Sequence, residues 1–247
     1  MRGIVAFAAK RSWPVAGLVA LAFLQAGAAP RAATPTDDPF RAQRLALVAQ
    51  LRAERDPRVD AQALAVLERV PRHRFVPDEL RTEAYANRPL PIGYGQTISQ
   101  PYIVALMTSL ARPASGQRIL EIGTGSGYQA AVLAAYGAQV YSVEIVEPLA
   151  RGAAQRLAPY ANVRTRVADG YYGWEEHAPF DAIVVTAAAG SIPPPLVAQL
   201  KPGGRLVIPV GGAFATQMLM LVEKDAAGHV HAQRIAPVRF VPLTGGR

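Results

Sequence analysis

The sequence of 247 residues predicts a single α/β domain built on a doubly wound, mostly parallel sheet. From Arg118 onward, short apolar segments alternate with amphipathic helical segments, the pattern of parallel strands joined by crossover helices. The last two apolar segments, Gln217–Val222 and His231–Leu243, are joined by a polar turn that contains glycine. They predict an antiparallel hairpin at the edge of the sheet.

The N-terminal residues are expected to lie outside this domain. Residues 1–28 resemble a secretory signal peptide, with basic residues before an uncharged apolar run and the small residues Ala26-Gly27-Ala28 at its end. A membrane anchor is one alternative, although the run is barely long enough and contains Pro14. A mistaken translation start is another. Residues 29–39 are rich in proline and predict a linker, so the folded domain is expected to cover residues 40–247.

Three features are expected before the sheet begins. Apolar residues at helical spacing predict amphipathic helices over Phe40–Arg55 and Asp60–Val70. The segment Asn87–Gln100 has no period and is expected to be a long loop, and such loops in small domains often carry function. A third helix is expected from Pro101, with Ser99 as its N-terminal cap.

Seven strands are expected in the sheet. The first five are Arg118–Gly123, Gln139–Ile145, Val163–Asp169, Asp181–Ala188 and Arg205–Val210, and the hairpin supplies the other two. Helices are expected from Gly127, from Glu147 and after Pro193. Ligands of open α/β sheets bind at the carboxyl ends of the strands. Those ends carry Gly123, Glu144, Asp169-Gly170 and Thr186-Ala187-Ala188.

A glycine motif follows the first of these strands. Gly123, Gly125 and Gly127 can take a positive φ and leave room for a ligand against bare backbone, and the helix that follows offers free N–H groups. Such triplets also occur in ordinary strand-to-helix turns. The third glycine comes one position earlier than in the dinucleotide fingerprint, where Tyr128 stands instead. This spacing, preceded by Glu121, favours a cofactor without a pyrophosphate.

Two carboxylates follow neighbouring strands. Glu144 lies about 20 residues after the first glycine, where a carboxylate accepts hydrogen bonds from both ribose hydroxyls. Asp169 precedes Gly170, and its carboxylate would face an adenine amino group. The alternatives are a solvated residue at a strand end for Glu144 and a plain Asp-Gly turn for Asp169. Together with the glycines, the two carboxylates predict a nucleoside cofactor with free 2′ and 3′ hydroxyls.

Composition argues against several other functions. The absence of cysteine excludes disulfides and thiolate metal sites. His229 and His231 alternate on a predicted strand, but no acidic cluster at ligand spacing accompanies them, so no metal site is expected. The net charge of +8 is scattered along the chain, without a recognition motif, and predicts no nucleic-acid partner. A mild positive field would still attract an anionic substrate.

The glycine motif, Glu144 and Asp169-Gly170 together resemble a class I S-adenosylmethionine-dependent methyltransferase. Five segments in order resemble the protein-L-isoaspartate O-methyltransferase family, namely Arg74-Phe75-Val76-Pro77, Leu90-Pro91-Ile92-Gly93, Gln96-Thr97-Ile98-Ser99-Gln100-Pro101, Leu120–Gln129 and Phe240-Val241-Pro242-Leu243. The resemblance spans about residues 40–243. It implies a Rossmann-like fold with S-adenosyl-L-methionine as cofactor. It also implies methylation of the free carboxylate of L-isoaspartyl residues in damaged proteins and peptides, with D-aspartyl residues as a further substrate class, as the first step of their repair.

The same resemblance implies roles for individual residues. Ser99 would be the active-site residue and would position the acceptor carboxylate, and a cap role is the competing interpretation. The implied cofactor-binding residues are Thr97, Ile98, Glu121, Gly123, Gly125, Gly127, Glu144, Asp169 and Gly170. Glu144 would hold the ribose, Asp169 the adenine, and Glu121 the glycine loop or the methionine amino group. Gln217, Val241, Pro242 and Leu243 would line a substrate groove.

Two other functions stay open at this stage. The cofactor motifs are shared by methyltransferases that act on other acceptors, and an exported, non-catalytic binding module with the same fold would account for the signal-like leader. Because S-adenosylmethionine is made in the cytosol, a cytoplasmic location is expected, with export to the periplasm as the alternative. No stable membrane partner is expected, and the oligomeric state does not follow from the sequence.

Overall fold

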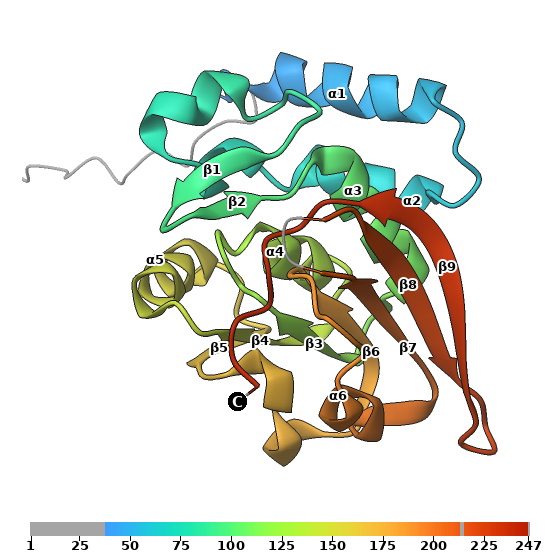
Figure 1. Cartoon of the computed structure of the whole chain (residues 1–247). Helices are drawn as coiled ribbons and strands as arrows, with labels where there is room; N and C mark the ends of the chain where they lie inside the picture. Colours follow the sequence, from blue (N-terminus) through green and yellow to red (C-terminus); the bar gives the residue numbers. More distant parts are fainter. Residues whose placement is uncertain (1–37, 213–214, 247) are drawn as a thin grey trace, which may run out of the picture. The chain divides into compact units, whose positions relative to one another are not determined.

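A seven-stranded sheet in the order β5-β4-β3-β6-β7-β8-β9 forms the centre of the domain (Figure 1). The computed structural model describes residues 38–212 and 215–246. The predicted leader and all but the end of the predicted linker therefore lie outside the described residues. The strands are β3 (Arg118–Ile122), β4 (Gln139–Glu144), β5 (Val163–Val167), β6 (Phe180–Val185), β7 (Leu200–Val210), β8 (Gln217–Lys224) and β9 (Val230–Val238). The first five are parallel, and β8 and β9 are antiparallel to their neighbours, as the sequence predicts.

Helices cover both faces of the sheet (Figure 1). The main helices are α1 (Arg41–Ala53), α2 (Ala61–Arg69), α3 (Pro101–Ala111), α4 (Tyr128–Ala134), α5 (Glu147–Leu157) and α6 (Pro194–Ala198). Short 3₁₀ turns are η1 (Arg72–Phe75), η2 (Asp78–Glu83), η3 (Gly170–Tyr172) and η4 (Glu175–His177). Among the described residues, no helix is long and apolar enough to cross a membrane.

Strand alternation divides the core into two layers. In β3, Ile119 packs into the layer formed with α1 to α4, whereas Leu120 and Ile122 pack into the layer on the opposite face. Successive side chains of a strand point to opposite faces, so Glu121 shares the face of Ile119. Its direct neighbour on β4 is Ser142. A polar pair is thereby placed inside an otherwise apolar layer, directly behind the glycine loop.

The expected loop Asn87–Gln100 contains an antiparallel hairpin, so the expectation of an irregular loop was wrong. Strands β1 (Leu90–Gly93) and β2 (Gln96–Ile98) pair with each other through a turn in which Gly93, Tyr94 and Gly95 all have a positive φ. The prolines in this segment interrupt the alternation by which a strand is recognised. The hairpin carries Thr97 and Ile98 to the carboxyl edge of the main sheet.

Ser99 is not the cap of α3. The residue in the cap position is Gln100, and no side chain caps the helix there. Pro101 at the start of the helix has no N–H to satisfy. The N–H of Tyr102 donates instead to the side-chain oxygen of Asn87, at 3.1 Å. The Tyr102 N–H is thus satisfied without the Ser99 hydroxyl.

The last strand ends at Val238, earlier than expected, because a side chain forms hydrogen bonds with the backbone that follows. Gln217 is fully buried, its oxygen accepts the Phe240 N–H at 2.8 Å, and its amide group donates to the Phe240 carbonyl at 3.3 Å. The chain then leaves the edge of the sheet and crosses to the end of β6. There the Ala188 N–H donates to Val241 O at 2.8 Å, and the Leu243 N–H donates to Ala188 O at 2.7 Å. Residues 239–246, which we call the tail, therefore lie over the carboxyl ends of the strands.

Candidate active site

The carboxyl ends of β3, β4 and β6 open into a pocket, here called the strand-end pocket, that the hairpin β1–β2 and the tail also border. It is lined by Gln96, Thr97, Ile122, Gly123, Gly125, Val143, Glu144, Ile145, Val146, Gly170, Thr186, Ala187, Val241, Pro242, Leu243 and Thr244. Its position is the one at which open α/β sheets bind ligands. Eight of the residues expected at the site therefore line one cavity: Thr97, Gly123, Gly125, Glu144, Gly170, Val241, Pro242 and Leu243.

The glycine loop is held open by its backbone. Gly123, Gly125 and Gly127 have φ of 93°, 52° and 91°, which disfavour residues with a side chain. A Cβ on Gly123 would lie 2.5 Å from Thr186 Oγ1. Gly127 lines none of the described cavities, and a Cβ there would lie 3.1 Å from the Leu157 side chain. Gly127 thus lets α5 pack close to the start of α4, and Gly123 lets the Thr186 side chain pack against the loop. Gly123 and Gly125 both line the strand-end pocket.

Glu144 is a buried carboxylate at the end of β4. One oxygen accepts the Gly125 N–H at 2.8 Å, and the other accepts the Val146 N–H at 2.9 Å. A carboxylate oxygen can accept more than one hydrogen bond. Glu144 therefore fixes the glycine loop and still has lone pairs for hydroxyl donors in the strand-end pocket. The alternative of a solvated carboxylate at a strand end is wrong, because Glu144 is buried and accepts two backbone N–H groups.

Glu121 lies in a smaller cavity, here called the glycine-loop recess, which contains Ile98, Ser99, Glu121, Gly125, Ser126 and Gln129 among its walls. Ser142 donates to one carboxylate oxygen of Glu121 and pairs with the Thr124 hydroxyl at 2.6 Å. The other oxygen, Oε1, has no hydrogen-bond partner among the described residues. Burial is the main cause that raises the pKa of Glu121 to about 8, and the nearby charge of Glu144 adds to it. A carboxyl with this pKa is mostly protonated at neutral pH, and a cationic group placed in the recess would stabilise its ionised, accepting form.

Asp169 forms the local Asp-Gly turn that was the alternative interpretation, and it also makes one contact that the sequence did not indicate. One oxygen accepts the Tyr171 N–H at 2.9 Å, and the other accepts the Gly246 N–H at 2.7 Å. The residue lines none of the described pockets, although its neighbour Gly170 does. A Cβ on Gly170 would lie 2.4 Å from Ile122, so glycine is required for the chain to pass β3 this closely. The tail therefore already donates a hydrogen bond to one oxygen of the carboxylate that was expected to face adenine.

Ser99 faces a separate cavity of about 440 Å³, here called the Ser99 pocket. Its walls are Pro89, Thr97, Ser99, Gln100, Ile103, Thr186, Thr216, Pro237, Val238, Arg239, Phe240 and Val241. The Ser99 side chain makes no hydrogen bond within the described residues. Its hydroxyl is therefore available to donate to a ligand. Of the expected groove residues only Val241 lines this pocket, because Pro242 and Leu243 face the strand-end pocket and Gln217 is buried behind Phe240.

The three cavities meet at two threonines. Thr97 and Thr186 line all of them. A group in the strand-end pocket and a group in the Ser99 pocket would thus face each other across this junction. The sequence analysis named Thr186 only as part of a strand end and gave it no role. The one signal that could have found it is its position as a polar residue directly after a buried strand.

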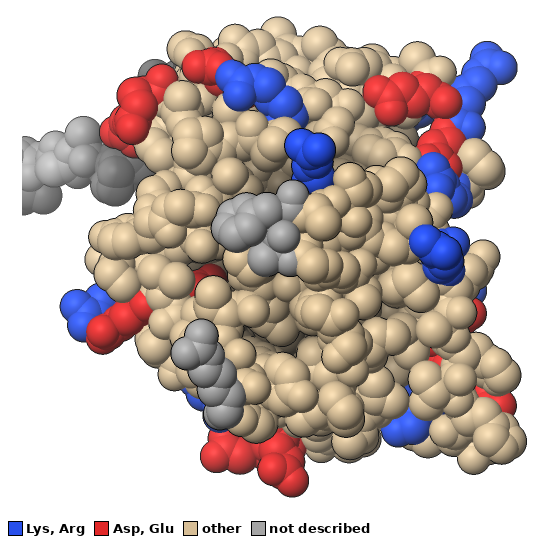
Figure 2. All heavy atoms as spheres, in the orientation of Figure 1, with Lys and Arg blue, Asp and Glu red and all other residues tan. Residues whose placement is uncertain are grey.

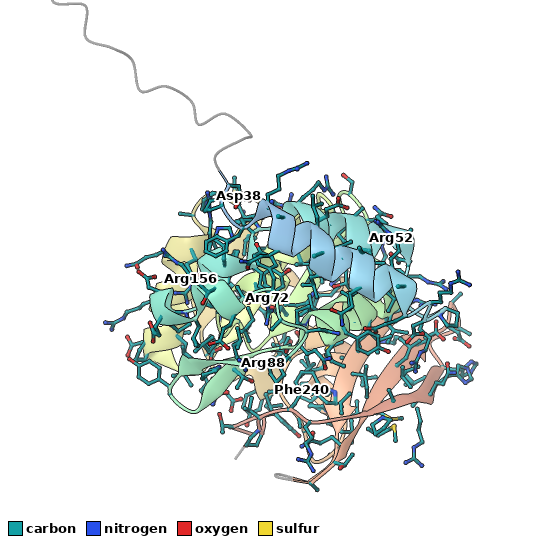
Figure 3. The ribbon with its side chains drawn as sticks, turned by 90° about the horizontal axis from the view of Figure 1, so that it is seen from above. Asp38, Arg52, Arg72, Arg88, Arg156 and Phe240 are labelled. Atoms are coloured by element: carbon teal, nitrogen blue, oxygen red, sulfur yellow. The ribbon has the colours of Figure 1, made fainter. Side chains whose placement is uncertain are left out.

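The walls around the junction are supported from the N-terminal layer. Arg72, labelled in Figure 3, is fully buried, and its Nε donates to the Ala84 carbonyl at 2.8 Å. Its guanidinium lies over the ring of Tyr128, 5.2 Å from the centroid. Burial lowers the pKa of Arg72 to about 10, so the group is charged at neutral pH. This contact ties η1 to the first residue of α4, next to the glycine loop.

Charged groups are sparse around the Ser99 pocket. Arg239 is the one charged residue among its described walls. On the face drawn in Figure 2, Lys and Arg side chains alternate with Asp and Glu and form no extended basic stripe. The field at the pocket is therefore mildly positive rather than strongly cationic.

A doubly wound sheet with a glycine loop and a loop-anchoring carboxylate at its carboxyl edge defines a Rossmann-like methyltransferase fold, and comparison with known proteins gives the family. The family model of protein-L-isoaspartate(D-aspartate) O-methyltransferase matches residues 42–247. The chain is 56% identical to protein-L-isoaspartate O-methyltransferase 2 of Syntrophobacter fumaroxidans, over 93% of this chain and 96% of the relative. It is 62% identical to the protein of the same name from Polaromonas sp., over 82% and 97% of the two chains. The chain therefore belongs to the protein-L-isoaspartate O-methyltransferase family.

Solved structures agree with this placement. One structure of a protein-L-isoaspartate O-methyltransferase matches with a TM-score of 0.73 and 28% identity, covering 82% of this chain and 66% of that one. A Plasmodium falciparum structure in complex with S-adenosyl-L-homocysteine matches with a TM-score of 0.71 and 25% identity, covering 81% and 98%. The resemblance seen in the sequence and the predicted fold are thus confirmed.

Proposed function

We propose that the protein transfers the methyl group of S-adenosyl-L-methionine to the free carboxylate of L-isoaspartyl residues in damaged proteins and peptides, with D-aspartyl residues as a further substrate class. The observation that carries this proposal is the junction at Thr97 and Thr186, where the strand-end pocket meets the Ser99 pocket. One cavity has the features of a nucleoside site. The other is large enough for a side chain and its flanking backbone, and it contains an unengaged hydroxyl.

The residues present fit the cofactor. Gly123 and Gly125 leave bare backbone against the strand-end pocket. Glu144 would accept hydrogen bonds from the ribose hydroxyls while it anchors the loop. The unpartnered oxygen of Glu121 would receive the methionine ammonium group. Asp169 would receive the adenine amino group beside the Gly246 N–H, which makes the tail part of the adenine site.

The proposed reaction needs no strong base. The acceptor is a carboxylate with a pKa near 4, so it is ionised at neutral pH. The cofactor supplies an electrophilic methyl group when bound. Ser99 would donate its hydroxyl hydrogen to one carboxylate oxygen and so hold the other toward the junction. Rate would come from positioning the two groups and from excluding water, since the tail and the hairpin β1–β2 cover the site. The adjacent backbone amide nitrogen would then attack the methyl ester without the enzyme, methanol would leave and a succinimide would form, and hydrolysis of this ring returns some normal aspartate.

The electrostatics of the Ser99 pocket support an anionic acceptor. Arg239 at its wall would attract a carboxylate, and no acidic residue is among the described walls to repel it. A neutral or cationic acceptor would find no complementary charge there. This is the observation that favours the isoaspartyl carboxylate over the acceptors of other methyltransferases.

The proposal is tested with a matched pair of peptides. The protein is incubated with methyl-labelled S-adenosylmethionine and either an isoaspartyl peptide or its aspartyl twin, and the base-labile label is counted. Labelling of the isoaspartyl peptide alone is expected. Equal labelling of both peptides, or a label stable to base, would show another acceptor, and cofactor binding without any transfer would show a non-catalytic binding module.

The cytosol is the proposed place of action, because the cofactor is made there. Export is the alternative that the leader-like residues 1–28 suggest. Mass spectrometry of the N-terminus of the protein from its native cell distinguishes them. An intact or untranslated leader would support the cytosol, and cleavage after Ala28 would show export.

A further inference from the structure

The turn between α1 and α2 contains an ion pair that lines none of the three cavities. Arg58 Nε donates to one carboxylate oxygen of Asp56 at 2.9 Å, and Nη2 donates to the other at 2.7 Å. This two-point contact fixes the plane of the guanidinium. Hydrogen bonds from Arg58 are the main cause that lowers the pKa of Asp56, so the pair stays charged at neutral pH. The turn is also held against α3, because the Asp60 N–H donates to the Ser109 hydroxyl at 3.0 Å.

The same guanidinium donates to two further elements. Its Nη2 donates to the Tyr102 hydroxyl at 3.2 Å, in the first turn of α3, and its Nη1 donates to the Ile235 carbonyl at 3.0 Å, on β9. The Tyr102 hydroxyl donates in turn to Asp56. The planar side chain of arginine has five N–H donors and can make these contacts at once. Arg58 thus joins the start of α3 to β9, whose end lies beside the turn between α1 and α2 (Figure 1).

The contact on β9 falls at a bulge. Two neighbouring residues of β8 pair with Ala236 and Arg234, so Ile235 between them has no partner on β8. A bulge bends its strand and leaves the extra residue unpaired. Since β9 is the edge strand, β8 is its single neighbour in the sheet. The hydrogen bond from Arg58 to the Ile235 carbonyl therefore holds the bend of β9 from outside the sheet.

Both anchor points of Arg58 adjoin walls of the Ser99 pocket. Tyr102 immediately precedes Ile103, which lines this pocket. Ile235 comes two residues before Pro237, which also lines it. The strand-end pocket, by contrast, contains no residue of α3 or β9 among its walls. The contacts of Arg58 thus concern the cavity that would take the acceptor, not the cavity that would take the nucleoside.

We propose that Arg58 is a positioning residue for the acceptor: by joining α3 to the bulge of β9 it sets the spacing of two walls of the Ser99 pocket, and thereby the affinity for the isoaspartyl segment. The inference rests on the proposed function, which makes this pocket the acceptor site. An exposed ion pair by itself stabilises a fold only a little. The expected effect of losing Arg58 is therefore on acceptor binding rather than on folding or on the cofactor.

The test separates charge from geometry. Arg58→Lys keeps the positive charge but replaces the planar fork by a single ammonium group, which cannot bridge the three partners. Tyr102→Phe removes the link to α3 and keeps the ring. Arg81→Lys is the matched control, because Arg81 also pairs with a nearby aspartate, Asp78 at 2.8 Å, and lines none of the cavities. For each protein, KM and kcat are measured with an isoaspartyl peptide, and cofactor affinity is measured by calorimetry with S-adenosylhomocysteine.

We expect KM for the peptide to rise about three- to tenfold in Arg58→Lys and by a smaller factor in Tyr102→Phe, with kcat within about twofold of wild type. Cofactor affinity should not change in either variant, and Arg81→Lys should match wild type throughout. A wild-type KM in Arg58→Lys, or a loss of cofactor affinity as large as the rise in KM, would overturn the proposal. If Arg58→Lys does not fold, Tyr102→Phe is judged by the same criterion. A wild type that does not methylate the isoaspartyl peptide would refute the proposed function, and this inference with it.

Discussion

Replacement of Glu144 by glutamine removes one acceptor from the glycine loop with almost no change in size. In the wild type, the Gly125 N–H at 2.8 Å and the Val146 N–H at 2.9 Å each meet a carboxylate oxygen. The amide of glutamine has one oxygen, so its NH₂ group must face one of these donors. A charge-assisted hydrogen bond contributes about 1.5–3 kcal/mol. We therefore expect the free energy of unfolding to fall by about 2 kcal/mol.

Cofactor affinity should fall in the same variant for two reasons. The loop loses its anchor, and the side chain loses an acceptor for the ribose. Loss of a second hydrogen bond of about 1.4 kcal/mol corresponds to tenfold weaker binding, which calorimetry with S-adenosylhomocysteine measures directly. Urea unfolding gives the stability change.

Glu147→Gln is the control, since Glu147 is exposed and its one ion pair within the described residues is with Arg151 of α5. The control should leave the affinity unchanged and alter stability by less than about 0.5 kcal/mol. A Glu144→Gln protein with wild-type stability and wild-type affinity would refute the geometry described for the loop.

Three further predictions concern other parts of the site. Ser99→Ala should lower turnover more than cofactor affinity, since the hydroxyl faces the acceptor pocket, and equal turnover in a steady-state assay would remove Ser99 from the reaction. Asp169→Ala should weaken cofactor binding by about 1–3 kcal/mol, and unchanged affinity by calorimetry would exclude Asp169 from the site. Burial raises the pKa of Glu121 from 4.5 to about 8, so the unfolded chain loses this proton first as pH rises. The free energy of unfolding should therefore decrease between about pH 5 and 8, and a slope that is the same in Glu121→Gln would contradict this origin.

Much of the fold could be predicted from patterns that depend on burial. Alternation of apolar strands and amphipathic helices predicted the parallel strands, because the central strands β3, β4 and β6 bury nearly all of their residues. The final hairpin, whose strand β9 is largely exposed, was predicted from its polar, glycine-containing turn. The glycines and Glu144 could be located because a tight, ligand-sized turn at a strand end restricts the residue types that fit. These signals are local in the chain.

One missed element is local: the prolines of the hairpin β1–β2 interrupt the alternation by which a strand is recognised. The other contacts that were missed join distant segments. Strand β9 ends early because the buried side chain of Gln217, on β8, forms hydrogen bonds with the N–H and the carbonyl of Phe240. The hydrogen bond from the Gly246 N–H to Asp169 and the hydrogen bond from the Thr186 hydroxyl to the Gly123 carbonyl likewise join segments that are far apart in the sequence. Local sequence patterns do not show which distant segments come into contact.

The most direct measurement of the central claim follows one isoaspartyl peptide over time by liquid chromatography and mass spectrometry, with the protein and S-adenosylmethionine present. If the two pockets act as proposed, the peptide first gains one methyl group on its free carboxylate, then passes through the succinimide, and accumulates as the aspartyl form over repeated cycles. A methyl group found on any other atom, or a peptide that stays isoaspartyl while the cofactor is consumed, would contradict the account.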